Sequence, residues 1–426
     1  MISADLAVTR CNQVVTCSGA VPKRSSDLRD IGVIEDGSIA SKEGKIVFVG
    51  TDDALHQNVR LDAGGIQIDG RGHVALPGFV DSHTHLPFAG SREEEFLLRL
   101  KGFTYRQLAA RGLGIQTTVE ATRKASEDDL VALSLKRLDN MLLHGTTTAE
   151  AKSGYGLNLK DELKQLKAIK RADAIHPVDI IPTFLGAHEV PGEYKSRKAE
   201  YIHFLIHEIL PRVRSEELAE FFDVFCEEGV YSIGETEKLI KAAKEAGLKI
   251  KLHADEFVSL DGAVLAAREG AASADHLSAV SEEGIRYLAD SRTVATLLPG
   301  VSYFLMHEKK APARKLIDRG AAVALATDFN PGSAMNESLL FVMRHAVYTL
   351  NMSIEESINA VTANAAFALH RENEVGSLEP GKKMDCILCE VPNYPYLVYH
   401  FGINPIKHVI KKGKIAVRDG KRSAQT

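Results

Sequence analysis

The sequence contains no tryptophan and only five cysteines among its 426 residues. The cysteines are odd in number and scattered, which argues against a disulfide framework and favours a reducing compartment, so we expect a cytoplasmic protein. No run of about 18 apolar residues is present, and we therefore expect no membrane-spanning helix. A basic segment followed by a short apolar one is also missing from the first residues, so we expect no signal peptide.

An excess of positive charge is lacking as well. The 52 basic and 57 acidic residues give a net charge of −5, which leaves no basic face of the kind that nucleic-acid binding requires. This balance does not exclude a small anionic substrate, because a single buried arginine can bind a carboxylate. The composition, with 45% hydrophobic and 26% charged residues, is typical of a globular protein.

The two ends of the chain share one pattern. Residues 1–73 and 376–426 contain short β-prone segments that are separated by turns with glycine or aspartate. Because these two segments lie at opposite ends of the chain, they indicate one small β-sandwich domain that is built from both termini.

The middle of the chain, residues 74–375, alternates apolar β-branched segments with amphipathic helical ones. About eight strands with helices between them are typical of a (β/α)8 TIM barrel. A doubly wound open sheet is the alternative, but polar residues follow many strands, and in a barrel those strand ends converge on one mouth. The expected strands are Val74–Asp81, Thr146–Ala149, Asp179–Leu185, Phe222–Cys226, Lys249–Leu252, Ala272–Ala274, Thr293–Leu298 and Ala322–Ala326.

The strongest local motif is the pair His83 and His85 at the end of the first expected barrel strand. Residues two apart on a strand point the same way, so both imidazoles can face the barrel interior and share one ion. Two partly buried histidines without a ligand are the alternative for an isolated His-x-His pattern. The apolar strand and the Pro77-Gly78 pair before the motif favour the metal interpretation.

Two further strands end in residues that could complete a metal site. His253 ends the strand that begins at Lys249, and Asp328 follows the last expected strand. Each has an ordinary alternative, since Asp328 could cap a helix and His253 could be a core histidine. Three histidines and one carboxylate from three strands nevertheless predict a site for one divalent metal, zinc or iron, with room for water.

Other polar residues lie next to this predicted site. Glu256 follows His253 by three residues, and Asp275 and His276 end the sixth expected strand, where they could supply an acid, a base or an orienting group.

Two patterns carry less weight. His203 and His207 have metal-pair spacing on a helix but no third ligand near in sequence, and Cys386 and Cys389 form a lone Cys-x-x-Cys inside an expected strand, which favours core packing.

The whole set resembles the amidohydrolase superfamily of metal-dependent hydrolases over nearly the full chain. Within the superfamily, five segments together are similar to the imidazolonepropionase family. The resemblance implies hydrolytic ring opening of 4-imidazolone-5-propanoate to N-formimidoyl-L-glutamate in histidine degradation, and it suggests a homodimer. The five segments are Lys152–Leu157, Leu185–His188, Val224–Gly229, His253–Glu256 and Asp328–Pro331.

The resemblance also implies roles for individual residues. Binuclear members of the superfamily typically carry a carboxylated lysine on the fourth barrel strand, and the absence of lysine from residues 222–228 favours one metal. We expect Glu256, His276 and Asp328 to be catalytic, and Arg92 to hold the propanoate tail in a two-pronged contact. Lys152 is expected to be structural or to face the substrate. The expected substrate-binding residues are Arg92, Tyr155, His188, Glu256, Asn330, Gly332 and Ser333.

Two alternatives stay open at this point. Another cyclic amidohydrolase or a nucleobase deaminase would share the barrel and the metal ligands, but a planar neutral base would have no need of Arg92. A non-catalytic assembly protein of the same fold would typically have lost metal ligands, whereas all four candidates are present here.

Overall fold

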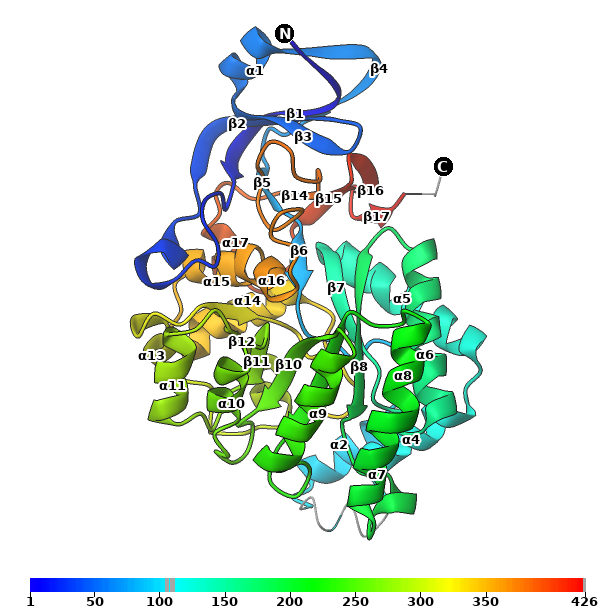
Figure 1. Cartoon of the computed structure of the whole chain (residues 1–426). Helices are drawn as coiled ribbons and strands as arrows, with labels where there is room; N and C mark the ends of the chain where they lie inside the picture. The colour runs from blue at the N-terminus through cyan, green and yellow to red at the C-terminus, as the bar shows by residue number, and fades with distance from the viewer. Residues whose placement is uncertain (104–106, 108–111, 424–426) are drawn as a thin grey trace.

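Eight parallel strands in the middle of the chain form one sheet in the order β13-β12-β11-β10-β9-β8-β7-β6. The structure is a computed structural model that describes residues 1–103, 107 and 112–423. Helices surround the strands, as the (β/α)8 prediction required (Figure 1). The strands are β6 Phe79–Asp81, β7 Thr146–Lys152, β8 Asp179–Ala187, β9 Phe221–Cys226, β10 Lys249–Ala254, β11 Ser273–His276, β12 Val294–Leu297 and β13 Val323–Leu325.

The barrel closes between β6 and β13 through the residues that follow these two strands. Thr84 and Phe329 form an isolated parallel bridge. The amide of His85 donates to the carbonyl of Phe329 over 3.0 Å, and the amide of Asp328 donates to the carbonyl of His83 over 3.0 Å. Closure therefore brings the His-x-His motif and Asp328 together, although 243 residues separate His85 from Asp328 in the chain.

The helices follow from local signals in the sequence. Ser126 caps the helix that begins at Glu127, and its side chain and that of Asp129 form a reciprocal capping box. A π-helical turn, Leu205–Ile209, interrupts the helix between β8 and β9. The other helices near the barrel are α2 Glu93–Leu100, α4 Ile115–Lys124, α5 Glu127–Leu143, α6 Leu159–Ile175, α7 Lys198–Phe204, α8 Leu210–Ser215, α9 Ile233–Glu245, α10 Gly262–Arg268, α11 Glu282–Ala289, α12 Pro299–Phe304, α13 Ala313–Asp318, α14 Leu339–Leu350, α15 Ile354–Ala360 and α16 Ala363–Ala368.

A second, mostly antiparallel sheet is built from both ends of the chain, as predicted, and lies at one end of the barrel (Figure 1). Its nine strands belong to one hydrogen-bonded sheet, and residues 424–426 of the expected terminal segment lie outside the described residues. Two short helices accompany it, α1 Asp52–Asn58 and α17 Tyr396–Tyr399. The strands are β1 Ile2–Val15, β2 Val33–Lys42, β3 Lys45–Thr51, β4 Val59–Asp69, β5 Val74–Pro77, β14 Cys386–Cys389, β15 Ile406–Lys411, β16 Lys414–Arg418 and β17 Lys421–Arg422.

The single strand expected at Val74–Asp81 was wrong, because the structure divides it at Gly78. β5 pairs with β1 and β14 in the terminal sheet, whereas β6 pairs with β7 in the barrel. A side chain at position 78 would meet Thr147, since an added Cβ would lie 2.3 Å from its Oγ1. Glycine therefore allows the chain to pass closely from one sheet into the other, and this passage leads directly to the His-x-His motif.

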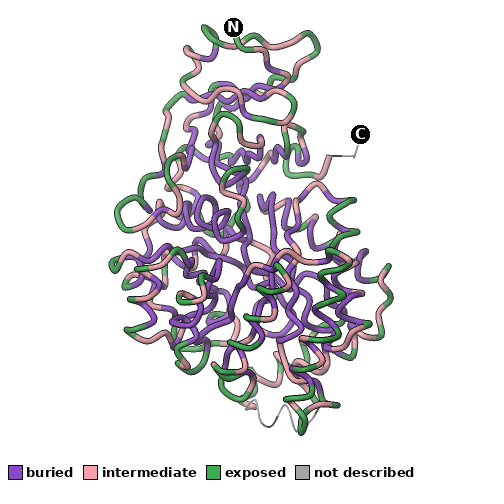
Figure 2. The backbone as a smooth tube through the Cα atoms, viewed as in Figure 1, coloured by how far each residue is buried: buried purple, intermediate pink, exposed green. Residues whose placement is uncertain are grey.

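The barrel strands run through the buried interior of the larger part of the molecule (Figure 2). Every residue of β7 is buried, including Glu150 and Lys152. No helix among the described residues combines the length and the apolar character that crossing a membrane would require.

Candidate active site

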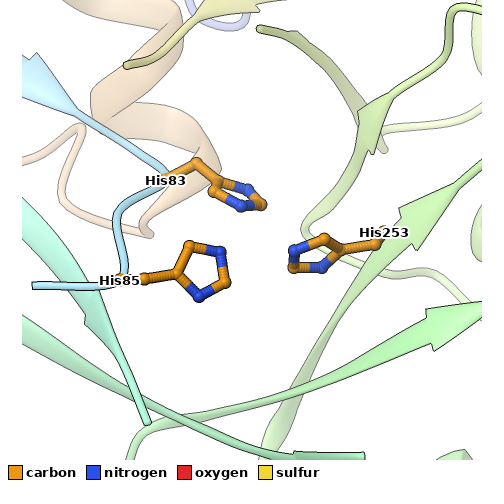
Figure 3. A group of neighbouring side chains, drawn as sticks. All are labelled: His83, His85 and His253. Atoms are coloured by element: carbon orange, nitrogen blue, oxygen red, sulfur yellow. The ribbon is translucent and has the colours of Figure 1, made fainter. Parts of the chain in front are cut away.

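Three histidine side chains meet at the mouth of the barrel. His83 and His85 follow β6, and His253 lies on β10 across the mouth. One ring nitrogen of each lies within 4.8 Å of those of the other two, and all three residues are buried. Their rings turn toward a common point (Figure 3). Alternation along the chain explains why His83 and His85 face the same way.

Asp328 completes this group from the last strand. Its Oδ1 lies 3.3 Å from Nε2 of His83 and 3.2 Å from Nε2 of His85. The backbone of Asp328 has φ +51°, and Asp255, His276 and Leu277 near the mouth also have positive φ. Such strained positions cluster at functional sites, where the surrounding structure holds them. The structure thus brings together all four residues that the sequence predicted as metal ligands.

These residues fit a divalent metal. Nε2 of His83, Nε2 of His253 and Oδ1 of Asp328 are buried without a hydrogen-bond partner among the described residues. A buried polar atom without a partner costs about 1–3 kcal/mol, so this grouping is costly unless a ligand binds it. Three imidazoles and one carboxylate are the donor set of catalytic zinc and iron sites that keep a position for water.

Two buried carboxylates orient two of the histidines. Oδ2 of Asp275 lies 2.6 Å from Nδ1 of His83, and Oδ2 of Asp223 lies 2.9 Å from Nδ1 of His253. The contact with His83 is a hydrogen bond, and a carboxylate at Nδ1 places the proton there and leaves Nε2 free to bind a metal. The contact with His253 is an ion-pair distance without hydrogen-bond geometry at Nδ1. Asp275 therefore has an orienting position, one of the roles that the sequence left open, whereas Asp223 was not recognised.

Glu256 and His276 face each other beside the histidines. Nδ1 of His276 lies 3.5 Å from Oε1 of Glu256, and Nε2 of His276 has no hydrogen-bond partner among the described residues. Burial, together with the charges of Asp328 and Glu227, raises the pKa of Glu256 well above its ordinary value. Burial also lowers the pKa of His276 well below its ordinary value, which favours a neutral imidazole.

Arg92 lies at the start of α2 and is held by a neighbour. Its Nε and Nη2 donate to the buried carboxylate of Glu95 over 2.9 and 2.7 Å. An added Cβ at Gly332 would lie 2.1 Å from Nη1, so this third nitrogen lies against the loop that follows Asp328. In this structure Glu95 thus makes the two-pronged contact that was predicted for the substrate, and Nη1 has no hydrogen-bond partner among the described residues.

Tyr155 and His188 surround His85. The ring of His188 stacks on that of His85 with centroids 5.0 Å apart, and the Tyr155 ring lies 5.8 Å from His85. The carboxylate of Glu162 accepts the amides of Gly154, Gly156 and Leu157, and this fixes the loop that carries Tyr155. Glu162 was not recognised from the sequence, because its partners are backbone groups.

Asn330 and Ser333 belong to the loop that follows Asp328. Oδ1 of Asn330 accepts the amides of Gly332 and Ser333, each over 2.8 Å, and its Nδ2 donates to the carbonyl of Asp328. The side chain of Asn330 therefore shapes the loop. Oγ of Ser333 lies 3.5 Å from Oδ2 of Asp328, so its hydroxyl reaches the edge of the candidate metal site.

Comparison with known proteins assigns a family to this architecture. The model of the amidohydrolase family matches residues 74–416. The chain is 49% identical to the imidazolonepropionase of Geobacillus kaustophilus over 420 residues, which covers 98% of this chain and 99% of that protein. It is 46% identical to the imidazolonepropionase of Symbiobacterium thermophilum, with 99% of each chain covered. The chain belongs to the imidazolonepropionase group of the amidohydrolase family.

Solved structures support the same fold at low identity. A triazine hydrolase variant matches with a TM-score of 0.75 and 18% identity over 99% of this chain and 96% of that chain. Guanine deaminase of Escherichia coli matches with a TM-score of 0.67 and 16% identity over 97% of this chain and 98% of that chain. Likeness at this identity concerns the fold of the barrel and terminal sheet.

The amidohydrolase barrel also contains a supporting residue that the sequence did not reveal. Glu227 follows β9, and its carboxylate accepts the amides of Glu256, Phe257 and Val258 over 3.0–3.1 Å. It thereby fixes the loop that carries Glu256. In the sequence Glu227 is one of two adjacent glutamates, and no local signal distinguishes it from Glu228.

The two patterns that carried less weight do not belong to the candidate metal site. His203 and His207 are exposed, with ring centroids 4.2 Å apart. The group His83, His85 and His253 is the one with metal-binding spacing in the part of the chain that the structure describes. Cys386 and Cys389 are buried in β14, and burial raises the pKa of Cys389 to about 12.

Proposed function

We propose that the chain is an imidazolonepropionase, which hydrolyses 4-imidazolone-5-propanoate to N-formimidoyl-L-glutamate. The observation that carries this proposal is the convergence of His83, His85, His253 and Asp328 within a chain that is 45–49% identical to imidazolonepropionases over nearly its full length. The substrate is inferred from the relatives, and the hydrolytic chemistry is inferred from the arrangement of the four residues.

The four converging residues would hold one divalent ion, zinc or iron. Such an ion acts as a Lewis acid and lowers the pKa of bound water towards about 7. One ion is favoured over two, because the fourth barrel strand, β9, contains no lysine to carry a bridging carboxylate. On that strand Asp223 is already paired with His253 and Lys152.

Two side chains transfer protons, and a third stabilises the charge that develops on the ring carbonyl. Asp328 accepts a proton from the attacking water, since it is the carboxylate among the proposed ligands. His276 is neutral and directs Nε2 toward the oxygen of the ring carbonyl, where charge develops. Burial raises the pKa of Glu256 well above its ordinary value, which favours a role as the acid that donates to the leaving ring nitrogen.

The propanoate tail would lie toward the loop at Gly332. Nη1 of Arg92 lies against this loop, and Glu95 fixes the guanidinium that carries it. Tyr155 and His188 would contact the ring, because their rings lie beside His85. The amides of Gly332 and Ser333 are already bonded to Asn330, so the hydroxyl of Ser333 is the better donor to substrate.

A direct comparison of substrates tests the proposal. The purified, metal-loaded chain is incubated with imidazolone propanoate, and loss of the ultraviolet absorbance of the imidazolone is followed together with formation of N-formimidoyl-glutamate. The same preparation is assayed with guanine. Turnover of the imidazolone alone supports the proposal. Turnover of guanine alone would assign the chain to the deaminases, and a metal-loaded chain without activity on either would contradict the proposal.

We further propose that the chain forms a homodimer, as the resemblance to its family suggests. Size-exclusion chromatography with light scattering measures the molar mass directly. A mass near twice the 46.4 kDa of one chain is expected, and a monomer at micromolar concentration would refute this part of the proposal.

A further inference from the structure

Two ammonium groups and three carboxylates lie together inside the barrel, and all five side chains are fully buried. Two of these carboxylates also contact the histidines of the candidate metal site. The five residues are Glu150, Lys152, Asp223, Lys251 and Asp275. Charges are rarely buried in such number unless their arrangement serves a site, because each one loses its hydration.

We propose that Lys152 is a positioning residue for the metal centre, because it holds the carboxylates that orient His253 and His83. The inference rests on the proposed metal site, but not on the identity of the substrate. It assigns Lys152 a role toward the metal ligands, which the sequence had left open between structure and substrate contact.

The ammonium group of Lys152 lies near three carboxylates. Its Nζ lies 2.7 Å from Oδ2 of Asp223, 2.8 Å from Oε2 of Glu150 and 4.0 Å from Oδ2 of Asp275. An ammonium group has three donors, so one lysine can serve several carboxylates at once. Lys251 supports the other side, where its Nζ lies 3.1 Å from Oε1 of Glu150 and 3.9 Å from Oδ2 of Asp275.

Two of these carboxylates in turn contact the histidines of the candidate metal site. The same Oδ2 of Asp223 that Lys152 contacts lies 2.9 Å from Nδ1 of His253, and the Oδ1 accepts the amide of His253. The Oδ2 of Asp275 lies 2.6 Å from Nδ1 of His83. Lys152 is thus linked to His253 through Asp223. A longer contact links it to His83 through Asp275. Loss of such outer contacts typically costs 10–100-fold in metal affinity.

Charge alone predicts the opposite effect of removing Lys152. Three carboxylates and two ammonium groups carry a net charge of −1, and Asp328 brings the total to −2, which one divalent ion would neutralise. Deleting one positive charge from this group would strengthen the attraction for a cation. A positioning role predicts weaker binding instead. The sign of the change therefore separates the two explanations.

The sharpest variant keeps the net charge constant. In the double variant Lys152→Met with Glu150→Gln, one positive and one negative charge are removed together. The dissociation constant of Zn²⁺ is measured on the metal-stripped full-length chain by competition with a chromophoric chelator. We expect zinc binding at least about 10-fold weaker than in the unmodified chain. Affinity that is unchanged within about two-fold, or tighter, would overturn the proposal.

A matched control separates positioning from loss of any buried ion pair. Lys411 and Asp385 form a buried pair in the terminal sheet, with Nζ and Oδ2 2.5 Å apart. The variant Lys411→Met with Asp385→Asn should lower the melting temperature but leave zinc affinity unchanged. Weaker zinc binding in this control to the same extent would show that general destabilisation explains the effect, and would overturn the proposal.

A second variant keeps the test decisive if the first does not fold. Lys152→Gln keeps a polar side chain but removes the positive charge that contacts Asp223, so charge alone predicts tighter zinc binding and lost positioning predicts weaker binding. The same competition should again show zinc binding at least about 10-fold weaker. A folded Lys152→Gln chain with unchanged or tighter zinc affinity would overturn the proposal. An unmodified chain that binds no zinc would instead refute the proposed metal site itself.

Discussion

Glu95 holds the guanidinium of Arg92 through two hydrogen bonds, 2.9 Å long at Nε and 2.7 Å long at Nη2. The pair is largely buried, with 11% of the Arg92 side chain and 4% of the Glu95 side chain exposed. This contact leaves Nη1 as the guanidinium nitrogen that lies nearest to Gly332. Arg92 is therefore preoriented toward the loop where we place the anionic tail of the substrate.

Replacing Arg92 tests this placement. Arg92→Ala should raise KM for imidazolone propanoate about 10–100-fold with a smaller change in kcat, because a charge-assisted hydrogen bond to the tail is lost. Steady-state kinetics measure both constants. Arg197→Ala is a matched control, since Arg197 pairs with Glu200 at the same spacing but on the surface. An unchanged KM in Arg92→Ala would show that the tail binds elsewhere.

Gly332 should matter because of what lies against it. In Gly332→Ala the new Cβ would lie 2.1 Å from Nη1 of Arg92, so the guanidinium must move. We expect KM to rise about 10-fold, with little further rise when Arg92→Ala is added, because both changes act on one contact. Gly234→Ala meets no atom within 4 Å and is the control. Fully additive effects of the two changes would argue against their coupling.

Asp328 should be indispensable for turnover. Asp328→Ala removes both a proposed metal ligand and the proposed acceptor of the water proton, so kcat should fall by at least about 10³-fold. Kinetics and metal analysis on the same sample measure the two losses. Asp318→Ala is the control, since its side chain is exposed. An Asp328→Ala chain that retained a tenth of the activity would exclude this role.

Glu227 should act on turnover through the loop of Glu256. In Glu227→Gln one carboxylate oxygen is replaced by an amide NH2 group, which cannot accept a hydrogen bond. Either the amide of Val258 or those of Glu256 and Phe257 would then lose their acceptor. We expect kcat to fall about 10-fold, since a misplaced acid transfers its proton less well. The exposed neighbour offers Glu228→Gln as the control. Equal kcat values in the two variants would contradict the expected role.

Asp179 should link the terminal sheet to the barrel in a pH-dependent way. Its carboxylate lies 3.0 Å from Lys411, 3.2 Å from Lys383 and 2.5 Å from Lys412. Burial raises the pKa of Asp179, but the three lysines outweigh burial and hold it below its ordinary value. The contribution to stability is therefore complete above the unfolded pKa of about 3.9 and is lost as the pH falls toward the lower folded pKa.

Asp179→Asn measures that contribution. At pH 7 the free energy of unfolding of the variant, measured by urea denaturation, should be about 1–2 kcal/mol lower than that of the unmodified chain, because three lysines lose their common partner. The difference from the unmodified chain should shrink as the pH is lowered from 5 to 3. Asp128→Asn is the control, since that side chain is 83% exposed. A difference that grew below pH 4 would have the wrong sign.

The sequence predicted the barrel, and it predicted that the four candidate ligands would converge, because both depend on local patterns. The strands are apolar segments of ordinary length, and the ligands stand at or just beyond strand ends. The division at Gly78 was missed because apolar residues continue on both sides of it. The close approach to Thr147 is a tertiary contact, which the local sequence does not reveal. The proposed domain limits at residues 73 and 376 stay a prediction.

The supporting residues of the site could not be predicted in the same way. Glu227 and Glu162 bind backbone amides, and Asp223 binds a histidine on the neighbouring strand, so none of them leaves a pattern in its own segment. The role of Arg92 toward the substrate stays a prediction, and in the structure Glu95 makes the two-pronged contact that we had expected for the substrate. Opposite charges three residues apart are common on exposed helices, so the spacing of Arg92 and Glu95 did not indicate a buried pair.

Titration of the metal-stripped chain with Zn²⁺ or Fe²⁺, followed by the ultraviolet absorbance of imidazolone propanoate, tests the central claim most directly. The account predicts no turnover without metal, and activity that rises linearly and saturates at about one ion per chain, with N-formimidoyl-glutamate as the product. Full turnover by the metal-free chain, saturation only at two ions, or a fully loaded chain that leaves the imidazolone intact would contradict it.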